Sequence, residues 1–414
     1  MTQKTIKTQC CIVGGGPAGM ILGYLLARNG IKVTVLEKWN DFFRDFRGDT
    51  IHPSIMNLLE ELGLLEDFFK LPHEKTYQIG FQINGEMKIL ADFKKTKMKH
   101  PFIAFVPQWD FLSFIAKQAK QYPHFDLRME TQATDLIKKQ GKVIGIKARH
   151  KKEILSIHAD LVVGADGRHS TIRKEAGLES KDYGAPMDVL WFRISRNSSD
   201  PTQSFGCLDK GRILVMIQRK DYWQAGFVVK KGGVEEAKAQ GLDSFRNHIQ
   251  GLAPFLENRV NEIKSWEQVK SLEVKVNRLK QWSSNGVICI GDAAHAMSPV
   301  GGLGINVAIQ DAVAAANILV PAFKRGGPTS RDLKKIQKRR NFAVKLLQRL
   351  QLFLQNQLIA KVLKGKEQPK IPWFFGVIER FSFLKKIPAY LIGIGPRPEH
   401  LSEELKRSHS AKVK

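Results

Sequence analysis

The feature that most constrains this chain is a glycine turn between an apolar run and a helical pattern. Gln9 to Val13 is a short apolar run, and residues 14–19 read Gly-Gly-Gly-Pro-Ala-Gly. In a Gly-x-Gly-x-x-Gly spacing the first glycine permits a tight turn, the second lets the backbone approach a pyrophosphate, and the third lets the helix pack closely on the strand. The helix N-terminus adds free amides and partial positive charge. We therefore expect a dinucleotide site, formed by Gly14, Gly16, Pro17, Ala18 and Gly19.

The residues that follow strengthen this interpretation. Met20 to Arg28 has a helical pattern and Ile31 to Leu36 a strand pattern, which completes a strand, helix, strand unit. Glu37 comes directly after the second strand, at the spacing where a carboxylate accepts hydrogen bonds from an adenosine ribose. We expect Glu37 and the adjacent Lys38 to belong to the same site.

Two further apolar strands end in a glycine and an aspartate. Residues 161–173 read LVVGADGRHSTIR, and residues 287–295 read VICIGDAAH. A carboxylate held at the carboxyl end of a strand lies where open α/β sheets bind ligands. Taken alone, the first stretch is better explained as a plain turn with a capping aspartate, and a lone His295 is more often structural than catalytic. The candidate residues are Asp166, Gly167, His169, Arg173, Gly291 and Asp292.

A glycine-rich loop follows the second of these stretches. Residues 299–306 read PVGGLGIN and lead into a helical pattern from Ala308 to Leu319. Free amides at a helix N-terminus stabilise a negative charge that lies close to them. This property suits an anion formed on a reduced cofactor, and the candidate residues are Gly304, Ile305 and Asn306.

Charge is the unusual part of the composition, because 66 Lys and Arg against 40 Asp and Glu give a net charge of +26 over 414 residues. Residues 321–414 contain 22 basic and 6 acidic residues. Such a region can bind anionic lipid, nucleic acid or acidic partners. A solvated basic face explains the excess of positive charge equally well. Phe381 and Phe383, after Trp373 and Phe374, are interleaved with these charges, as in segments that lie in a membrane interface. A helix that caps the core is the alternative.

Cysteine usage favours a reducing compartment. Cys10, Cys11, Cys207 and Cys289 have neither the pattern of a disulfide framework nor metal-ligand spacing. The apolar stretch from Cys10 to Ala27 imitates a secretory peptide, but glycines interrupt it. We expect a cytoplasmic protein that holds no metal. We also expect peripheral contact of the basic C-terminal region with the inner face of a membrane.

In this order and spacing, the three glycine-and-acid stretches resemble those of the class A flavoprotein monooxygenases, the para-hydroxybenzoate hydroxylase-like family of FAD-dependent aromatic hydroxylases. The resemblance covers most of residues 5–320, and it implies that FAD is the cofactor. Leu303 departs from the family by replacing a glutamine that is common in close relatives. The cofactor-binding residues that the resemblance implies are Gly14, Gly16, Pro17, Ala18, Gly19, Glu37, Lys38, Arg47, Gln108, Asp166, Gly167, His169, Arg173, Gly291, Asp292, Gly304, Ile305 and Asn306.

The resemblance also implies a reaction. NADPH or NADH would reduce the flavin, O2 would add at C4a, and the resulting hydroperoxide would hydroxylate an aromatic or polyketide-like small molecule. The protein would supply binding, orientation and exclusion of water. Pro299 at the flavin edge and Arg47 near the cofactor phosphates are the implied catalytic residues.

The substrate pocket is expected between the flavin and an inserted sheet. Alternate positions along strands can share one face of that sheet, and an ordinary sheet core is the other explanation for each of them. An inward-facing arginine there would favour an acidic or phenolic substrate. The candidate wall residues are Trp191, Arg193, Met216, Gln218, Gln224 and Phe227.

Other functions fit parts of the sequence. A flavin-dependent halogenase or an isoprenoid reductase is the alternative among enzymes, although the halogenase signature Trp-x-Trp-x-Ile-Pro does not occur in the chain. A basic lipid- or nucleic-acid-binding protein on a flavoprotein fold is the alternative outside enzymes. For the hydroxylase we expect an aromatic substrate and O2 as partners and no nucleic acid.

The predicted fold is α/β: a Rossmann-like FAD-binding domain with an inserted antiparallel β-sheet substrate domain and a C-terminal helical region. The flavin domain is predicted in three parts and the substrate domain in two. The predicted boundaries are 1–75, 101–180 and 281–320 for the FAD-binding domain, 76–100 and 181–280 for the substrate domain, and 321–414 for the basic helical region.

Overall fold

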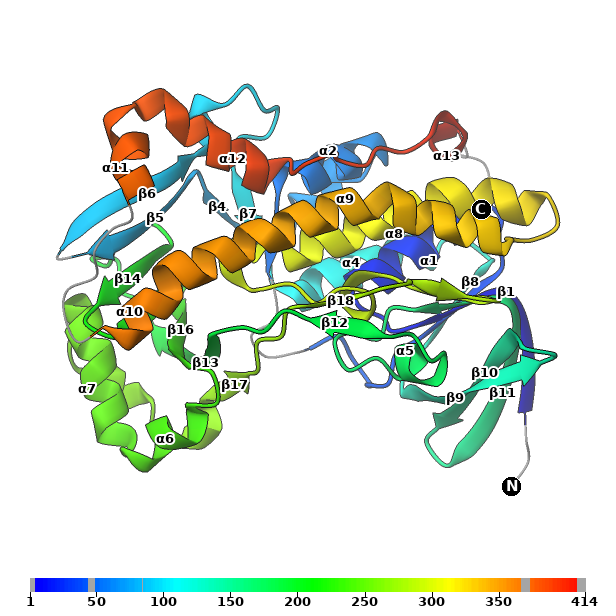
Figure 1. The fold of residues 1–414 in the computed structure, drawn as a ribbon, viewed down its shortest axis with the longest axis horizontal. Coiled ribbons are helices and arrows are strands. Elements are labelled where there is room, and N and C mark those ends of the chain that lie inside the picture. The colour runs from blue at the N-terminus through cyan, green and yellow to red at the C-terminus, as the bar shows by residue number, and fades with distance from the viewer. Residues whose placement is uncertain (1–3, 44–48, 84, 366–372, 408–414) are drawn as a thin grey trace.

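The computed structural model describes residues 4–43, 49–83, 85–365 and 373–407. Figure 1 shows an elongated molecule with one large sheet toward each end and long helices running between them. Helices and strands alternate in one part and strands dominate the other, so the predicted α/β class is confirmed.

The first large sheet carries the glycine turn. Its strand order is β19-β20-β11-β1-β2-β8, and the β9–β10 hairpin extends from β11. Strand β1 pairs in parallel with β2 and β11, and β11 pairs in parallel with β20. The carboxyl ends of these strands therefore meet at one edge. The strands are β1 (Lys4–Val13), β2 (Val33–Leu36), β8 (Phe125–Arg128), β9 (Thr131–Lys139), β10 (Lys142–His150), β11 (Glu153–Gly164), β19 (Ser283–Ser284) and β20 (Val287–Cys289).

Helix α1 (Pro17–Arg28) connects β1 to β2 and packs against α4 (Gln108–Ala119) and α8 (Gly304–Lys324). Proline is tolerated at the first helical position because its missing N–H has no partner there. Nearly every residue of α1 is buried, which is why its sequence shows no polar face. The shorter helices of this part are α2 (Pro53–Glu61), α3 (Leu65–Phe68) and α5 (Thr171–Glu175).

The second large sheet has the order β17-β13-β16-β15-β14-β5-β6 and is antiparallel except between β14 and β5. Helix α7 (Leu242–Leu252) packs on one face through an aromatic core, and α6 (Val234–Ala239) lies beside it. The strands are β5 (Gln78–Ile83), β6 (Glu86–Asp92), β13 (Met187–Ser195), β14 (Phe205–Asp209), β15 (Arg212–Gln218), β16 (Tyr222–Lys230) and β17 (Lys270–Leu272).

Two small sheets lie between these units. One has the order β3-β7-β4 and the other pairs β12 with β18. Their strands are β3 (Thr50–Ile51), β4 (Glu74–Thr76), β7 (Ile103–Phe105), β12 (Ser180–Asp182) and β18 (Asn277–Leu279).

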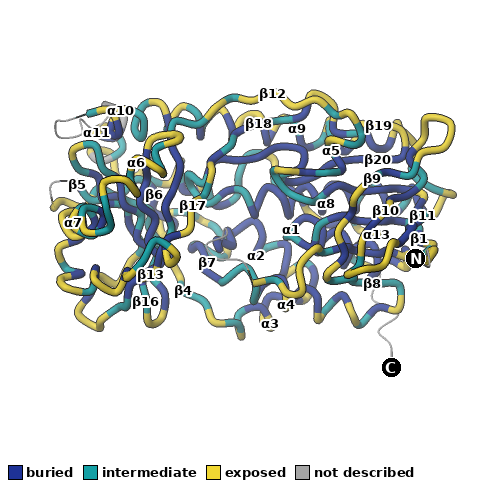
Figure 2. Tube along the Cα trace, turned by 90° about the horizontal axis from the view of Figure 1, so that it is seen from below, coloured by how far each residue is buried: buried dark blue, intermediate teal, exposed yellow. Residues whose placement is uncertain are grey.

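The C-terminal region crosses the whole molecule. Helix α9 (Ser330–Leu354) packs against α8 and continues through a π-helical turn (Gln355–Ile359) into α10 (Ala360–Lys364), which contacts β15 and β16. Helices α11 (Trp373–Arg380), α12 (Lys386–Gly393) and α13 (Glu403–Arg407) follow. In Figure 2 the buried segments lie along the interior, around α1 and α8. Among the described helices, one that includes α8 is apolar and long enough to span a membrane, but 83% of that apolar stretch is buried inside the molecule.

Candidate flavin site

The glycine turn after β1 leaves a space at the start of α1. A Cβ on Gly14, whose φ is +110°, would lie 2.2 Å from the Ala165 carbonyl oxygen, and a Cβ on Gly19 would lie 1.9 Å from the Gly14 carbonyl oxygen. A Cβ on Gly16 would meet no protein atom within 4 Å. The first and third glycines are therefore required by packing, and the second borders open space at a helix N-terminus. This arrangement fits the pyrophosphate of FAD.

The acid at the end of β2 lies against the same turn. The Glu37 carboxylate accepts hydrogen bonds from the Gly15 amide at 3.0 Å and from the Trp39 amide at 3.2 Å. It is thus held beside the open space, where it fits the predicted ribose contact. Lys38 is exposed, and its Nζ lies 5.1 Å from the centre of the Trp39 ring.

The second acid stretch is also at this edge. Asp166 follows β11, and its carboxylate accepts hydrogen bonds from the Ser170 hydroxyl and, at 3.1 Å, from the Ile172 amide. It therefore supports the N-terminus of α5, whose N-cap is Ser170, and burial raises the pKa of Asp166. Gly167 has a φ of +84°, and His169 is exposed. The residues predicted to contact the cofactor thus lie in the turn that precedes α5.

The third stretch completes the edge. A Cβ on Gly291 would lie 3.2 Å from Ala18 Cβ and 3.3 Å from Ala308 Cβ, so this turn is wedged between the starts of α1 and α8. Asp292 lies 3.5 Å from the Arg168 guanidinium. Arg173 donates to the Arg168 carbonyl at 2.6 Å and to the Ala293 carbonyl at 3.3 Å, which joins the second stretch to the third.

The start of α8 faces the β3 segment. The Asn306 amide donates to the Thr50 carbonyl at 3.0 Å, and its oxygen accepts from the His52 amide at 2.9 Å. Its side chain is therefore structural, and only the backbone amides of Gly304, Ile305 and Asn306 are left as candidates for a cofactor contact. Gln108 is the first residue of α4, and Pro299 precedes the Val300 turn. Arg47 lies outside the described residues.

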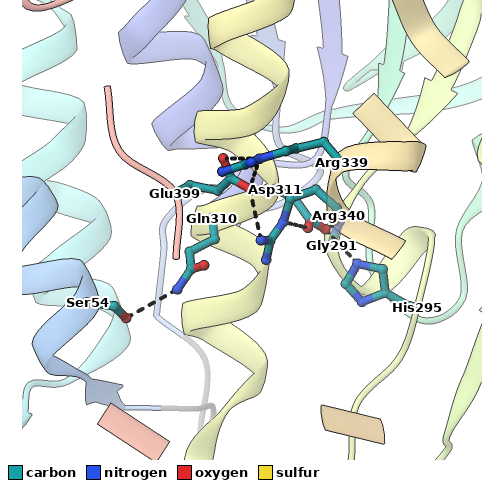
Figure 3. A network of polar contacts seen from close by, with 8 residues as sticks. All are labelled: Ser54, Gly291, His295, Gln310, Asp311, Arg339, Arg340 and Glu399. Carbon is teal, nitrogen blue, oxygen red and sulfur yellow. Dashed lines mark hydrogen bonds and ion pairs between the residues drawn. The ribbon is translucent and has the colours of Figure 1, made fainter. Parts of the chain in front are cut away.

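A buried ionic network connects the Gly291 turn at this edge to α8 and α9 (Figure 3). Asp311 on α8 accepts from the Gly291 amide at 3.0 Å, His295 Nε2 is 2.6 Å away, and Arg340 on α9 donates from Nε at 2.9 Å. Arg340 also pairs with Glu399 at 3.2 Å. Burial alone raises the pKa of Asp311, but His295 and Arg340 outweigh burial and the net shift is downward. Sequence reasoning treated His295 as structural and did not single out Asp311.

His52 links the β3 segment to the C-terminal region. Its Nδ1 lies 2.7 Å from the Ile392 carbonyl at the end of α12, and its Nε2 is buried with no partner among the described residues. Burial lowers the pKa of His52 to about 4, so the ring is neutral at neutral pH.

His52 therefore predicts a loss of stability in acid. Unfolded His52 binds a proton near its usual pKa of 6.5, whereas the folded ring binds one only near 4. Stability is then fully present above pH 6.5 and falls as the pH drops toward 4, by about 3 kcal/mol at roughly 1.4 kcal/mol per pKa unit. His52→Asn keeps a donor for Ile392 but does not titrate. Urea unfolding above pH 6.5 and at pH 4 should show that His52→Asn loses less unfolding free energy in acid than the wild type does. Equal losses in the two proteins would contradict this assignment.

The predicted substrate wall is split between two faces of the second sheet. Trp191 pairs with Gly226 and Arg193 with Gln224, so Trp191, Arg193 and Gln224 share one face. Met216 and Phe227 lie on the other face, in the core beneath α7, and Gln218 pairs with Trp223 on that face. The expectation that all six residues share a face is wrong, because a strand alternates with a period of two and both faces are covered here.

A buried ion pair that sequence reasoning missed joins this sheet to the flavin domain. Arg219, directly after β15, contacts the Asp49 carboxylate and donates to the Gln224 side-chain oxygen at 2.9 Å. Both ionic groups are buried, at 4% and 6% exposure, and the guanidinium lies 5.8 Å from the Phe105 ring centre. Burial raises the pKa of Asp49 to about 6 although Arg219 opposes the shift. Asp49 is two positions after the predicted Arg47 in the sequence, but its partner is 170 positions away.

Comparison with known proteins agrees with this geometry. The FAD binding domain family matches residues 7–350. The 6-methylpretetramide 4-monooxygenase of Streptomyces rimosus is 29% identical over 355 residues, covering 85% of each chain. Para-nitrophenol 4-monooxygenase of Pseudomonas sp. (strain WBC-3) is 22% identical over 77% of this chain and 79% of its own. The crystal structure of p-nitrophenol 4-monooxygenase from Pseudomonas putida DLL-E4 has a TM-score of 0.76 at 18% identity, covering 94% of this chain and 96% of that one.

The chain belongs to the FAD binding domain family, because the match extends over most of its length. Its class is that of the FAD-dependent monooxygenases, which are oxidoreductases, and this confirms the class and the cofactor that the three sequence stretches indicated.

Proposed function

We propose that this enzyme hydroxylates an aromatic or polyketide-like small molecule, with NADPH or NADH as reductant and O2 as the oxygen source. The observation that carries the proposal is the convergence of the Gly14 turn, Asp166 and the Gly291-Asp292 turn at one sheet edge, beside the start of α8. The names of the relatives support the substrate class, since one is a monooxygenase of 6-methylpretetramide and the other of para-nitrophenol.

In this proposal the chain binds and orients rather than makes bonds. Gly16, Glu37 and Asp292 hold the cofactor, and the amides at Gly304 and Ile305 face its negative charge. FAD bound there supplies electron transfer from the nicotinamide and activation of O2. The apolar surroundings of Trp191 and Val300 keep water from the reacting centre.

We propose Arg219 as the anchor for an acidic substrate, such as a phenolate or enolate. Its Nη1 is buried and has no partner among the described residues, while its other nitrogens contact Asp49 and Gln224. A buried donor without a partner is costly, so a ligand oxygen at this position would satisfy it. Arg193 stacks over Tyr222 at 4.9 Å on the same side of the sheet and adds positive charge.

The direct test uses the FAD-loaded protein with NADPH or NADH and a panel of ionisable phenols matched to their methyl ethers. We expect phenols to accelerate nicotinamide oxidation with little peroxide released, and ethers to do so less. Bromide-dependent product would instead indicate a halogenase, and substrate reduction without O2 a reductase.

Arg219→Met should separate anchoring from cofactor binding. We expect KM for the best phenol to rise about 30-fold or more, as for loss of a buried charged hydrogen bond, while FAD affinity changes little. Arg193→Met removes a more exposed guanidinium from the same face and is the matched control. An unchanged KM in Arg219→Met would contradict the assignment.

We also propose a peripheral membrane contact at the inner leaflet through α11, α12 and the turn between them. Phe381, Phe383 and Ile387 are large apolar side chains about half exposed or more, beside the exposed Arg380 and Lys386. The Trp373 and Phe374 side chains lie outside the described residues. Such a surface fits anionic lipid. The protein should sediment with vesicles containing phosphatidylserine and not with neutral ones, and Phe383→Ser should weaken this binding.

A further inference from the structure

Three buried glutamines follow one face of α9 and the turn after it. Gln348, Gln351 and Gln355 are spaced by three and four residues, so they share a helix face, and each is at most 1% exposed. Buried amides are expected to use their polar atoms on partners. Here the partners lie within residues 277–300, the segment that contains the Gly291-Asp292 turn and Pro299.

Gln351 holds the backbone on both sides of Pro299. Its oxygen accepts from the Ser298 amide at 3.2 Å, and its nitrogen donates to the Ser298 carbonyl at 3.0 Å and to the Val300 carbonyl at 2.8 Å. Proline has no N–H and so cannot donate a backbone hydrogen bond itself. One side chain from the C-terminal helix therefore contacts this loop on both sides of the proline.

Gln355 adds a second constraint. Its nitrogen donates to the Ser298 hydroxyl oxygen at 2.8 Å, and the same oxygen accepts from the Val300 amide at 3.2 Å. Gln355 is the first residue of the π-helical turn, a feature often found at functional sites. Leu358 and Ile359 of this turn pack in the cluster that contains Val300 and Trp191, on the face of the sheet proposed for substrate.

We propose that Gln351 and Gln355 are positioning residues that fix the Ser298–Val300 loop relative to the flavin edge. The C-terminal helix then helps to shape the pocket. This inference rests on the proposed function, because the loop matters for turnover only if the flavin lies beside it. In the alternative, the glutamines merely dock α9 and contribute to stability alone.

Gln348 provides the comparison that distinguishes these roles. It is as buried as Gln351 and donates to the Asn277 carbonyl at 2.8 Å and to the Ala296 carbonyl at 3.0 Å, so its side-chain nitrogen is bonded to the segment before the Ser298–Val300 loop and not to the loop itself. Asn356 is an exposed amide next to Gln355 and serves as the surface control.

The experiment compares Gln351→Met, Gln355→Met, Gln348→Met and Asn356→Met. Melting temperature and hydrogen exchange of residues 298–303 are measured on the apoprotein, and the visible spectrum and peroxide released per NADPH on the FAD-loaded protein. We expect the first two variants to speed exchange in this loop about 10-fold or more, because Gln351→Met loses three hydrogen bonds to it and Gln355→Met loses one. They should also alter the flavin band shape and raise peroxide release.

Gln348→Met should lower the melting temperature by a similar amount without changing the loop exchange or the flavin spectrum, and Asn356→Met should change none of them. Equal changes in all three glutamine variants, or a change in melting temperature only, would overturn the proposal. If the wild type binds FAD but oxidises no nicotinamide, the proposed function fails, and the exchange and spectral comparisons still decide the role of the glutamines.

Discussion

Gly16→Val should weaken FAD binding by about 100-fold or more, because its side chain would fill space that the cofactor needs while its Cβ meets no protein atom. The backbone at Gly16 has a φ of −76° and a ψ of −177°, which valine adopts readily. A Cβ there meets nothing within 4 Å. The apoprotein should therefore fold as the wild type does, and the defect should appear only in binding.

The measurement is a fluorescence titration of FAD into apoprotein, alongside a thermal melt without FAD. Gly376→Val on α11 is the matched control, since a Cβ at Gly376 also meets nothing within 4 Å and its φ is not positive. It should leave FAD affinity unchanged. Wild-type affinity in Gly16→Val would mean that the cofactor phosphates do not approach this turn.

Asp311→Asn should lower the unfolding free energy of the apoprotein by about 3 kcal/mol or more, as when one partner of a buried ion pair is removed. Asparagine keeps the size of the side chain but presents NH2 or a neutral oxygen to Arg340, which is 1% exposed. The Gly291 amide and His295 also lose the carboxylate that they share. The third acid stretch is thus loosened together with the contact between α8 and α9.

Urea unfolding of the apoprotein measures this effect directly. Glu404→Gln is the control, because Glu404 pairs with Lys324 near the end of α8 at 2.8 Å with both groups more than 40% exposed. An exposed pair should contribute only about 0 to 1 kcal/mol. Similar losses of unfolding free energy in Asp311→Asn and Glu404→Gln would show that burial does not determine how much the network stabilises the protein.

The flavin half of the site was predictable because its signals are local. Gly14, Gly16, Gly19 and Glu37 belong to one strand, helix, strand unit, and their spacing reflects backbone geometry that few other sequences meet. Asp166 and Asp292 follow apolar strands, and parallel pairing brings the ends of such strands together. The register itself was not needed for this prediction.

The substrate half was not predictable because its strands are covered on both faces. Trp191 faces the cluster that contains Val300, whereas Met216 faces the core beneath α7, and both are apolar residues at alternating positions. Each face carries an apolar cluster, so apolar residues alone do not tell one face from the other. Periodicity located the sheet but did not tell which of these residues share a face.

Contacts between segments far apart in the chain could not be predicted from the sequence either. Asp49 and Arg219 each look like ordinary charges near a turn, and only the fold brings them together. Gln351 and Gln355 lie in a strongly basic helical stretch, where polar residues suggest a solvated face, yet both are buried against the loop at Pro299. One face of the basic C-terminal helix is therefore packed against this loop and not solvated.

The central claim is that three separate stretches of the chain surround one FAD, and hydrogen exchange of the wild-type apoprotein with and without FAD tests it most directly. We expect FAD to slow exchange at the same time in peptides covering residues 13–20, 164–173 and 290–306, with peptides from α6 and α7 unchanged as internal controls. Protection of only one of the three peptides, or protection confined to the second sheet, would contradict the claim.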